Sequence, residues 1–382
     1  MNHPDVYTPW QPWSEAQTLH VAAAYSNPFR WRTRRELAND FKRHMQGSPN
    51  VALHFGELAY GDRPHEVTGD IEEDAVWRAS ERDKDDRPRH HRVNTRRNRG
   101  ELQLRTGAEL FHKENILNRV IQTFPPNWQY GMICDADFHF TRHDWALETI
   151  HQLQHYAFVQ PFSSYVDVTG ETYGMAQMPT RANTGFFFNY VNNGFRVSPQ
   201  YHNGTLPGQP AEPETYEGAM VEGRFMRGVG ATGGALAFTR AAFNAVGRLL
   251  DRCILGHADW YMAFGLVGLD APDIHTQKYS PDYVAYVNAW KERAQAIKRN
   301  VGYTDGMALH FFHGSKTRRA YSSRDKILAS HQFSPYRDIW EDDQGIYQLT
   351  PDKPSLRDDI RQYFRERSED DPNLYAPEKL MV

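Results

Sequence analysis

An apolar run that ends in two aspartates constrains this chain more than any other feature. Tyr130 to Cys134 reads as a buried strand, and Asp135 and Asp137 follow it with one residue between them. Side chains two apart on a strand share a face, and open α/β sheets bind ligands at the carboxyl ends of their strands. Two neighbouring carboxylates repel each other unless a cation lies beside them. A hard divalent cation that also carries a diphosphate would neutralise both carboxylates. Alone, the pattern is equally typical of an Asp-rich turn after a strand.

A strand–helix–strand unit opens the chain. Leu19 to Ser26 and Val51 to Phe55 are apolar runs typical of buried strands. Thr33 and Glu36 have the spacing of a capping box at the start of the intervening helix. This order predicts an α/β fold with a mixed, mostly parallel sheet flanked by helices. Further strands are expected at Tyr156–Phe162, Gly233–Phe238, Asp282–Val287 and Ala308–Phe312.

Two segments interrupt the pattern. Asp70 to Asp86 holds eight acidic and three basic residues, a net charge of −5, and Arg87 to Arg105 holds seven arginines and one acid, a net charge of +6. Apolar residues are sparse across residues 70–105, so we expect a mobile, charged excursion. Residues 170–230 are rich in Gly, Pro, Asn and aromatic residues. So long an irregular stretch predicts a long acceptor-side insertion, either a lid or binding loops.

Composition is that of an ordinary globular protein. The 382 residues are 40% hydrophobic and 24% charged, and the net charge of −4 gives no general attraction to nucleic acid or anionic membranes. No apolar run approaches the ~18 residues of a membrane-spanning helix, and the N-terminus lacks a signal-peptide pattern. Cys134 and Cys253 lie in apolar elements and make no disulfide framework. We therefore expect a cytoplasmic protein with one domain over residues 1–330 and a charged C-terminal appendage over residues 331–382.

Several motifs occur in an order that resembles a known family. They are Pro28-Phe29-Arg30-Trp31-Arg32, Asn115-Ile-Leu-Asn118, Cys134-Asp-Ala-Asp137, the Gly233-Gly234 strand, Leu255-Gly256-His257-Ala258-Asp259-Trp260, and His310-Phe-Phe-His313-Gly-Ser-Lys316. This order resembles the GT-A glycosyltransferases, and within them the β-1,4-galactosyltransferase-like and polypeptide GalNAc-transferase-like groups, over roughly residues 19–330. The resemblance implies a Rossmann-like GT-A sheet. It also implies transfer of a sugar from a UDP-sugar, or another nucleotide sugar, to a hydroxyl group of an acceptor.

The resemblance also implies which residues bind the donor. Arg30 and Arg32 match arginines that contact the nucleotide, and guanidinium groups suit phosphate oxygens. The alternative is two surface arginines at a helix start, where the helix dipole mildly disfavours cations. The remaining donor-binding candidates are Tyr25, Asn27, Asp135, Gly234 and Lys316.

A metal site is implied by the same resemblance. Asp137 matches the family's metal ligand, Asp135 is a neighbouring candidate ligand, and a late histidine should complete the site. Residues three apart on a straight strand face opposite ways. Both His310 and His313 can therefore bind the metal only if the chain bends near Gly314, and otherwise one of them is a packed histidine. A carboxylate with an imidazole is a fair site for Mn²⁺, with Mg²⁺ as the alternative.

The catalytic assignment rests on one acidic residue. Asp259 falls where the family places its catalytic base, and an inverting transferase needs a carboxylate to take the proton of the acceptor hydroxyl. This sequence departs from the family's Gly-Glu-Asp pattern by reading Gly256-His257-Ala258-Asp259. His257 is therefore the alternative base, and inversion at the anomeric carbon stays open.

The sequence does not identify the acceptor. It can be a saccharide, a protein, a small molecule or hydroxymethylated pyrimidines of phage DNA. The arginines of residues 87–105 favour DNA, because phosphate contacts carry much of the affinity for nucleic acid. The similar opposite charge of residues 70–86 favours a solvated loop instead. Two other classes remain as rivals: a non-catalytic protein that binds nucleotide sugars on the same scaffold, and a nucleotidyltransferase, which would usually carry a glycine-rich loop where Tyr25 to Arg32 has no glycine.

Overall fold

The computed structural model describes the chain over nine stretches. These are residues 14–68, 94–96, 100–168, 179–193, 219–221, 224–226, 229–314, 318–320 and 323–371. Lys316 lies outside the described residues, as do most of the expected charged excursion and most of the expected acceptor-side loops. No described helix has the length and apolar character needed to cross a bilayer.

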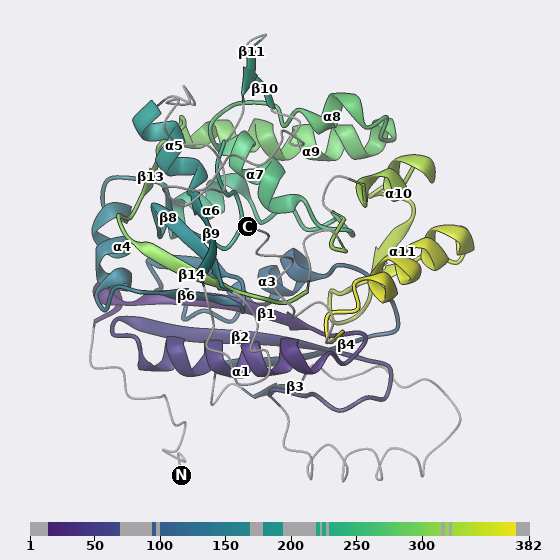
Figure 1. Cartoon of the computed structure of the whole chain (residues 1–382), viewed down its shortest axis with the longest axis horizontal. Coiled ribbons are helices and arrows are strands. Elements are labelled where there is room, and N and C mark those ends of the chain that lie inside the picture. Colours follow the sequence, from purple (N-terminus) through teal and green to yellow (C-terminus); the bar gives the residue numbers. More distant parts are fainter. Residues whose placement is uncertain are drawn as a thin grey trace, which may run out of the picture.

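A large mixed sheet forms the centre of the described structure (Figure 1). Its strands lie in the order β13 (Val301–Tyr303), β7 (Phe158–Gln160), β12 (Ala235–Thr239), β5 (Tyr130–Cys134), β1 (Leu19–Ser26), β2 (Val51–Tyr60), β4 (Glu101–Thr106) and β3 (Asn94–Arg96). The β1–β2, β1–β5, β2–β4 and β7–β13 pairs are parallel, whereas β12 and β3 pair antiparallel with their neighbours. The predicted α/β class, with a mixed and mostly parallel sheet flanked by helices, is confirmed.

The sheet is covered on both faces, as the apolar run of β1 requires. Leu19, Val21 and Ala23 pack in one core with α1 (Arg32–Gly47) and α4 (Trp145–Leu153). Ala22 belongs to the core on the opposite face. The longer helices of that second core include α3 (Lys113–Ile121), α6 (Arg240–Val246), α7 (Ala258–Leu266), α9 (Pro281–Ala294) and α11 (Pro354–Glu366).

A second, smaller sheet starts where β5 ends. Its strands lie in the order β6 (Phe138–Phe140), β14 (Met307–Phe311), β8 (Ser164–Val168) and β9 (Pro179–Thr184). The chain passes from the main sheet into this one through Asp135, Ala136 and Asp137. His310 is in register with Phe138 on one side and with Asp167 on the other. This junction brings late residues of the chain beside the two aspartates.

The remaining elements are short or peripheral. They are η1 (Glu15–Gln17), α5 (Phe186–Asn193), β10 (Ala219–Val221), β11 (Arg224–Met226), α8 (Asp273–Thr276), η3 (Gln295–Ile297), α10 (Asp325–Ser330), β15 (Ile339–Glu341) and β16 (Tyr347–Leu349).

Two expectations about local structure are wrong. The segment Asp282–Val287 is not a strand but part of α9, because the Ser280 hydroxyl accepts the Tyr283 amide as an N-cap and Pro281 occupies the first helical position. Thr33 does not cap α1, which begins at Arg32 without a capping side chain of its own. Its first amides are instead bound by Asp370, from the far end of the chain.

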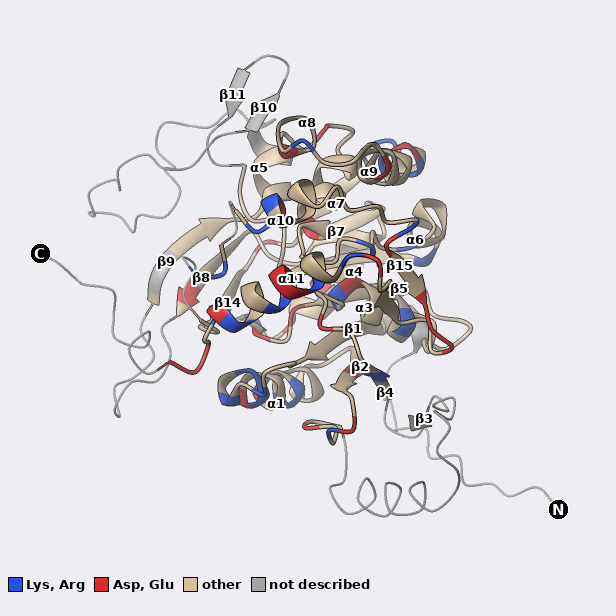
Figure 2. Cartoon of the chain, turned by 90° about the vertical axis from the view of Figure 1, so that its right-hand side faces the viewer, with Lys and Arg blue, Asp and Glu red and all other residues tan. Residues whose placement is uncertain are grey.

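The C-terminal segment is packed into the same molecule. Leu356, Ile360, Tyr363 and Phe364 of α11 are buried in the core that also holds α3 and α7. Asn115 of α3 binds the β15–β16 turn through the Gly345 carbonyl and the Tyr347 amide. Figure 2 shows α11, its ribbon coloured at acidic and basic residues, in front of the ends of the central strands. The boundary near residue 330 stays a prediction, although the two parts share one core.

Candidate active site

The carboxyl end of β5 places two aspartates at the junction of the two sheets. The Asp135 amide donates to the Gly234 carbonyl at 2.7 Å, which ties the strand end to β12. Gly234 has a φ of +91°, and a side chain there would meet the Phe138 ring at 2.6 Å. The Phe311 amide of β14 donates to the Asp137 carbonyl at 2.9 Å. These contacts hold Asp137 directly beside the chain that follows β14.

Asp137, His310 and His313 form a compact group. His313 Nε2 lies 2.9 Å from Asp137 Oδ2, His310 Nε2 lies 3.9 Å from Asp137 Oδ1, and the two Nε2 atoms are 3.3 Å apart. The strand ends at Phe311, and Gly314 adopts a φ of +98°. The chain thus bends after β14, so both histidines, not one, face the carboxylate. Asp137, His310 and His313 each offer one ligand atom, and these atoms lie within 4.8 Å of one another.

Asp167 orients one of these histidines. Its Oδ1 lies 2.6 Å from His310 Nδ1, and the β8–β14 register sets the two residues side by side. A proton on Nδ1 would leave Nε2 with a free lone pair toward Asp137. Histidines that bind metals commonly have such a carboxylate behind them. No sequence pattern pointed to Asp167, because its pairing with His310 depends on a register between strands about 140 residues apart.

The electrostatics of the group suit a divalent cation. Burial alone would raise the pKa of the Asp137 carboxyl, but His313, His310 and Arg319 together lower it below its usual range. Burial, with Arg319, lowers the pKa of His313 to about 4 despite Asp137. At neutral pH the group is thus an ionised carboxylate beside a neutral imidazole, which are the protonation states that bind metals. Asp137 Oδ1 is buried and accepts no hydrogen bond from the described residues. This donor set fits Mn²⁺ or a similar ion.

Asp135 is engaged differently. Its Oδ1 accepts from Lys113 Nζ at 3.0 Å, and Lys113 also lies 3.4 Å from Glu114 Oε1. Burial raises the pKa of Asp135, although Lys113 opposes the effect, and burial raises the pKa of Glu114 to about 7. The structure therefore groups Asp137, and not Asp135, with the two histidines. Asp135 instead positions an ammonium group at the start of α3.

A cleft runs along this strand end and encloses about 1140 Å³, including space open to solvent. Its lining holds five cationic side chains and three carboxylates, which suits an anionic ligand. The cations are Arg34, Lys113, Arg319, Arg324 and Arg367, and the carboxylates are Asp135, Asp137 and Asp259.

The structure does not bring Arg30 and Arg32 to this cleft. Trp31 is buried between them, so its neighbours turn outward. Arg30 has a φ of +58° and pairs with Glu66 at 2.9 Å, and Arg32 is exposed beside Glu36. Arg34, two residues later on α1, lines the cleft instead. The sequence motif therefore lies at the start of the helix that reaches the cleft, but the arginine of that helix in the cleft lining is Arg34.

Two other donor-binding candidates lie near the end of β1. Tyr25 lines the cleft, and its hydroxyl donates to Glu66 Oε2 at 2.7 Å. Asn27 is buried and binds the main chain of Trp31 through both its amide nitrogen and its amide oxygen. Asn27 thus shapes the turn before α1 rather than lining the cleft. Lys113, which lines the cleft, was not among the sequence candidates.

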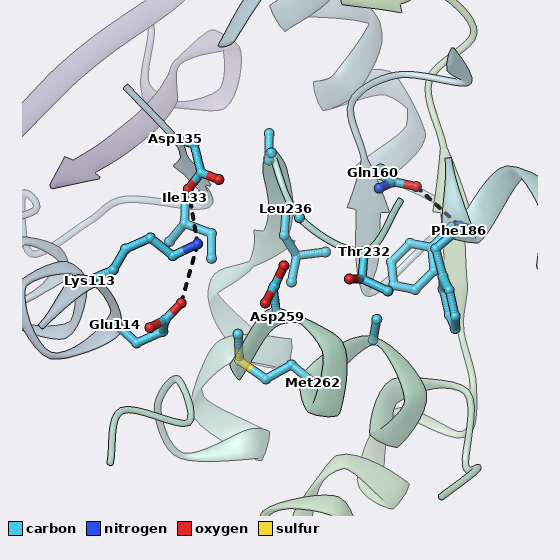
Figure 3. Close-up of a pocket in the computed structure, with 15 residues that line it drawn as sticks. Lys113, Glu114, Ile133, Asp135, Gln160, Phe186, Thr232, Leu236, Asp259 and Met262 are labelled. Atoms are coloured by element: carbon cyan, nitrogen blue, oxygen red, sulfur yellow. Dashed lines mark hydrogen bonds and ion pairs between the residues drawn. The ribbon is translucent and has the colours of Figure 1, made fainter. Parts of the chain in front are cut away.

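A smaller pocket adjoins the cleft at Lys113, Asp135 and Asp259, and encloses about 450 Å³ (Figure 3). Asp259 lies on α7, opposite Lys113 and Glu114. A side chain at Gly233 would meet Asp259 Oδ2 at 2.5 Å, so the glycine makes room for the carboxylate. Apolar groups complete the wall: Ile133, Phe186, Phe187, Leu236 and Met262. The pocket thus combines carboxylate oxygens with an apolar surface.

His257 precedes α7 and also lines the cleft. It has a φ of +68°, and its Nδ1 pairs with Asp325 of α10. Asp273 lies close to both but accepts hydrogen bonds from Trp260 at 2.8 Å and Tyr261 at 2.6 Å. His257 and Asp259 therefore both line the cleft from the start of α7, and His257 is the one that pairs with Asp325.

Comparisons with known proteins add little. No family model matches the chain, and no curated protein matches it. Fifty-eight solved chains match it by structure. One is a protein from Desulfovibrio desulfuricans G20, provisionally named as a nucleotide-diphospho-sugar transferase; the match spans 91% of this chain and 98% of that chain, with 10% identity and a TM-score of 0.28. So low a TM-score carries no argument about function.

Proposed function

We propose that this protein is a metal-dependent glycosyltransferase that moves a sugar from a nucleotide-diphosphate sugar to a hydroxyl acceptor. The observation that carries the proposal is the convergence of Asp137, His310 and His313 in the lining of a cationic cleft that adjoins an acidic pocket. A cationic cleft suits a diphosphate, and a pocket of carboxylates and apolar groups suits a neutral sugar. A ligand that is anionic at one end and a polyol at the other matches both parts.

Asp137, His310 and His313 would hold the divalent cation, with Asp167 orienting His310. When bound, the cation supplies positive charge that stabilises the diphosphate as it leaves. Arg34, Arg319, Arg324 and Arg367 offer guanidinium groups for the phosphate oxygens in the same cleft. Lys113, held between Asp135 and Glu114, lies where the cleft meets the pocket and suits the phosphate nearest the sugar.

Asp259 is the proposed general base. Its carboxylate lies in the pocket, opposite Lys113, and accepts no hydrogen bond from the described residues. It is therefore available to take the proton of an acceptor hydroxyl as the sugar is transferred. This arrangement supports an inverting reaction. His257 is the alternative base, and its pairing with Asp325 gives it a partner that holds one ring nitrogen.

UDP is the proposed nucleotide, and Mn²⁺ or Mg²⁺ the proposed metal. Calorimetry with UDP, GDP, ADP and CDP tests both proposals, first with Mn²⁺ and then with EDTA. We expect UDP to bind in Mn²⁺ more tightly than the other three nucleotides and to lose most of its affinity in EDTA, and tighter binding of another nucleoside diphosphate would replace UDP in the proposal. Equal affinity in both conditions would remove the metal from the proposal, and no binding of any nucleotide would refute the donor class.

A further inference from the structure

Phe364 and Arg367, near the end of the described chain, line the cleft, and the residues that follow them hold its arginines. Glu369 has 0% of its surface exposed, and its carboxylate accepts from Arg34 Nε at 2.5 Å and Nη2 at 2.9 Å. Arg367 Nη2 lies 2.6 Å from the same carboxylate. One buried acid thus holds two of the arginines that line the cleft.

Neighbouring residues fix this segment on both sides. Asp370 accepts the Arg32 amide at 2.5 Å and the Thr33 amide at 3.0 Å, which caps α1. On the other side the Glu369 side chain lies against Gly314, where an added Cβ would meet its Cγ at 2.9 Å. Glu369 therefore connects the start of α1 to the chain that carries His313.

The arginines need such a partner. Arg34, Arg319, Arg324 and Arg367 all line one cleft, and like charges at close range repel. The Arg34 and Arg367 guanidinium groups also lie over the same ring, that of Trp31, at 5.1 and 5.9 Å. A long cationic side chain loses considerable rotamer freedom when it binds a ligand, unless its position is fixed beforehand. Arg34 is fixed by Glu369 and by the Ser26 carbonyl at 2.9 Å.

We propose that Glu369 is a positioning residue for donor binding, which holds Arg34 and Arg367 in place for the diphosphate. The inference rests on the proposed function and extends it to a residue of the C-terminal segment. A competing account is a latch, in which Glu369 occupies the arginines and must leave before a diphosphate enters. The complete burial of Glu369 and its two-point contact with Arg34 favour positioning.

The test uses the full chain with the nucleoside diphosphate that the wild type binds in Mn²⁺, inorganic pyrophosphate, and the matching nucleoside. Glu369→Gln keeps the shape and removes the charge. We expect diphosphate and pyrophosphate to bind about tenfold more weakly or worse, because preorganised arginines are lost, while nucleoside affinity stays unchanged. Asp338→Asn is the matched control, since Asp338 is a buried acid paired with Lys353 at 2.6 Å, outside the cleft lining.

The outcomes separate the accounts. Unchanged diphosphate affinity overturns the positioning role, tighter binding establishes the latch instead, and an equal loss for the nucleoside shows a merely structural role. If Glu369→Gln does not fold, Glu369→Asp keeps the charge with a shorter reach and should show the same selective loss; without that loss the inference fails. If the wild type binds no diphosphate at all, the proposed function fails first.

Discussion

Replacing Asp167 with asparagine is the sharpest test of how the metal group is built. Asp167 acts on the group through His310, whose Nδ1 lies 2.6 Å from its carboxylate. Asparagine keeps the size of the side chain and can still accept from Nδ1, but it removes the negative charge. The variant therefore removes the negative charge beside His310 while keeping the packing of β8 against β14.

The size of the effect follows from the type of hydrogen bond. A bond to a charged group contributes about 1.5–3 kcal/mol and a neutral one about 0.5–1.5 kcal/mol. The difference of roughly 1–1.5 kcal/mol corresponds to about a five- to tenfold loss of metal affinity, since 1.4 kcal/mol is a factor of ten. This lies at the lower edge of the ~10–100-fold range for partners of metal-binding histidines.

The assay is a titration of Mn²⁺ into the protein by calorimetry, with and without bound nucleoside diphosphate. We expect Asp167→Asn to weaken Mn²⁺ binding by about five- to tenfold while thermal unfolding shows an intact fold. Nucleotide affinity in EDTA should not change, because Asp167 is not part of the cleft lining. Wild-type metal affinity in this variant would refute the reasoning, as would an equal loss of nucleotide binding in EDTA.

Two further predictions concern catalysis and stability. Asp259→Asn should leave donor binding intact and lower the transfer rate by on the order of 10²-fold or more. His257→Asn should lower the transfer rate by a smaller factor. If a transfer assay shows the larger loss for His257→Asn, the catalytic base is His257. Burial lowers the pKa of His112 to about 4 against hydrogen bonds to Ala108 and Asn115, so the unfolded chain binds more protons below pH ~6.5 and the free energy of unfolding decreases as the pH is lowered. By pH 5 this histidine should lower the free energy of unfolding by about 2 kcal/mol. In denaturant titrations, the free energy of unfolding of His112→Gln should therefore depend less on pH than that of the wild type. The same pH dependence in both proteins would contradict the assignment.

The parts of the site that the sequence predicted are those that depend on local order. Asp135 and Asp137 follow an apolar strand, and the main chain around them is set by β5 and β6. The proximity of His310 and His313 to Asp137 required only that β14 pair with β6 and that the chain bend near Gly314. Whether these residues bind a metal stays a prediction.

The parts that the sequence missed depend on contacts between distant segments. Asp167 reaches His310 through strand register, and Glu369 reaches Arg34 across 335 positions. The arginine motif suggested Arg30 and Arg32, but burial of Trp31 turns both outward and leaves Arg34 facing the cleft. The segment Asp282–Val287 was predicted as a strand because its apolar residues are compatible with a strand as well as with a helix. The N-cap Ser280 and Pro281 at the first helical position favour the helix that forms.

Hydrolysis of the nucleotide sugar in the absence of acceptor tests the central claim most directly. The wild type, Asp137→Asn and the surface control Asp144→Asn, whose residue is exposed and pairs with Arg142 at 2.8 Å, would each be incubated with a panel of nucleotide sugars in Mn²⁺ and in EDTA. The account predicts slow release of the nucleoside diphosphate from one donor by the wild type and the control in Mn²⁺, with no release in EDTA or by Asp137→Asn. Release at the same rate in EDTA, or by Asp137→Asn, would contradict it.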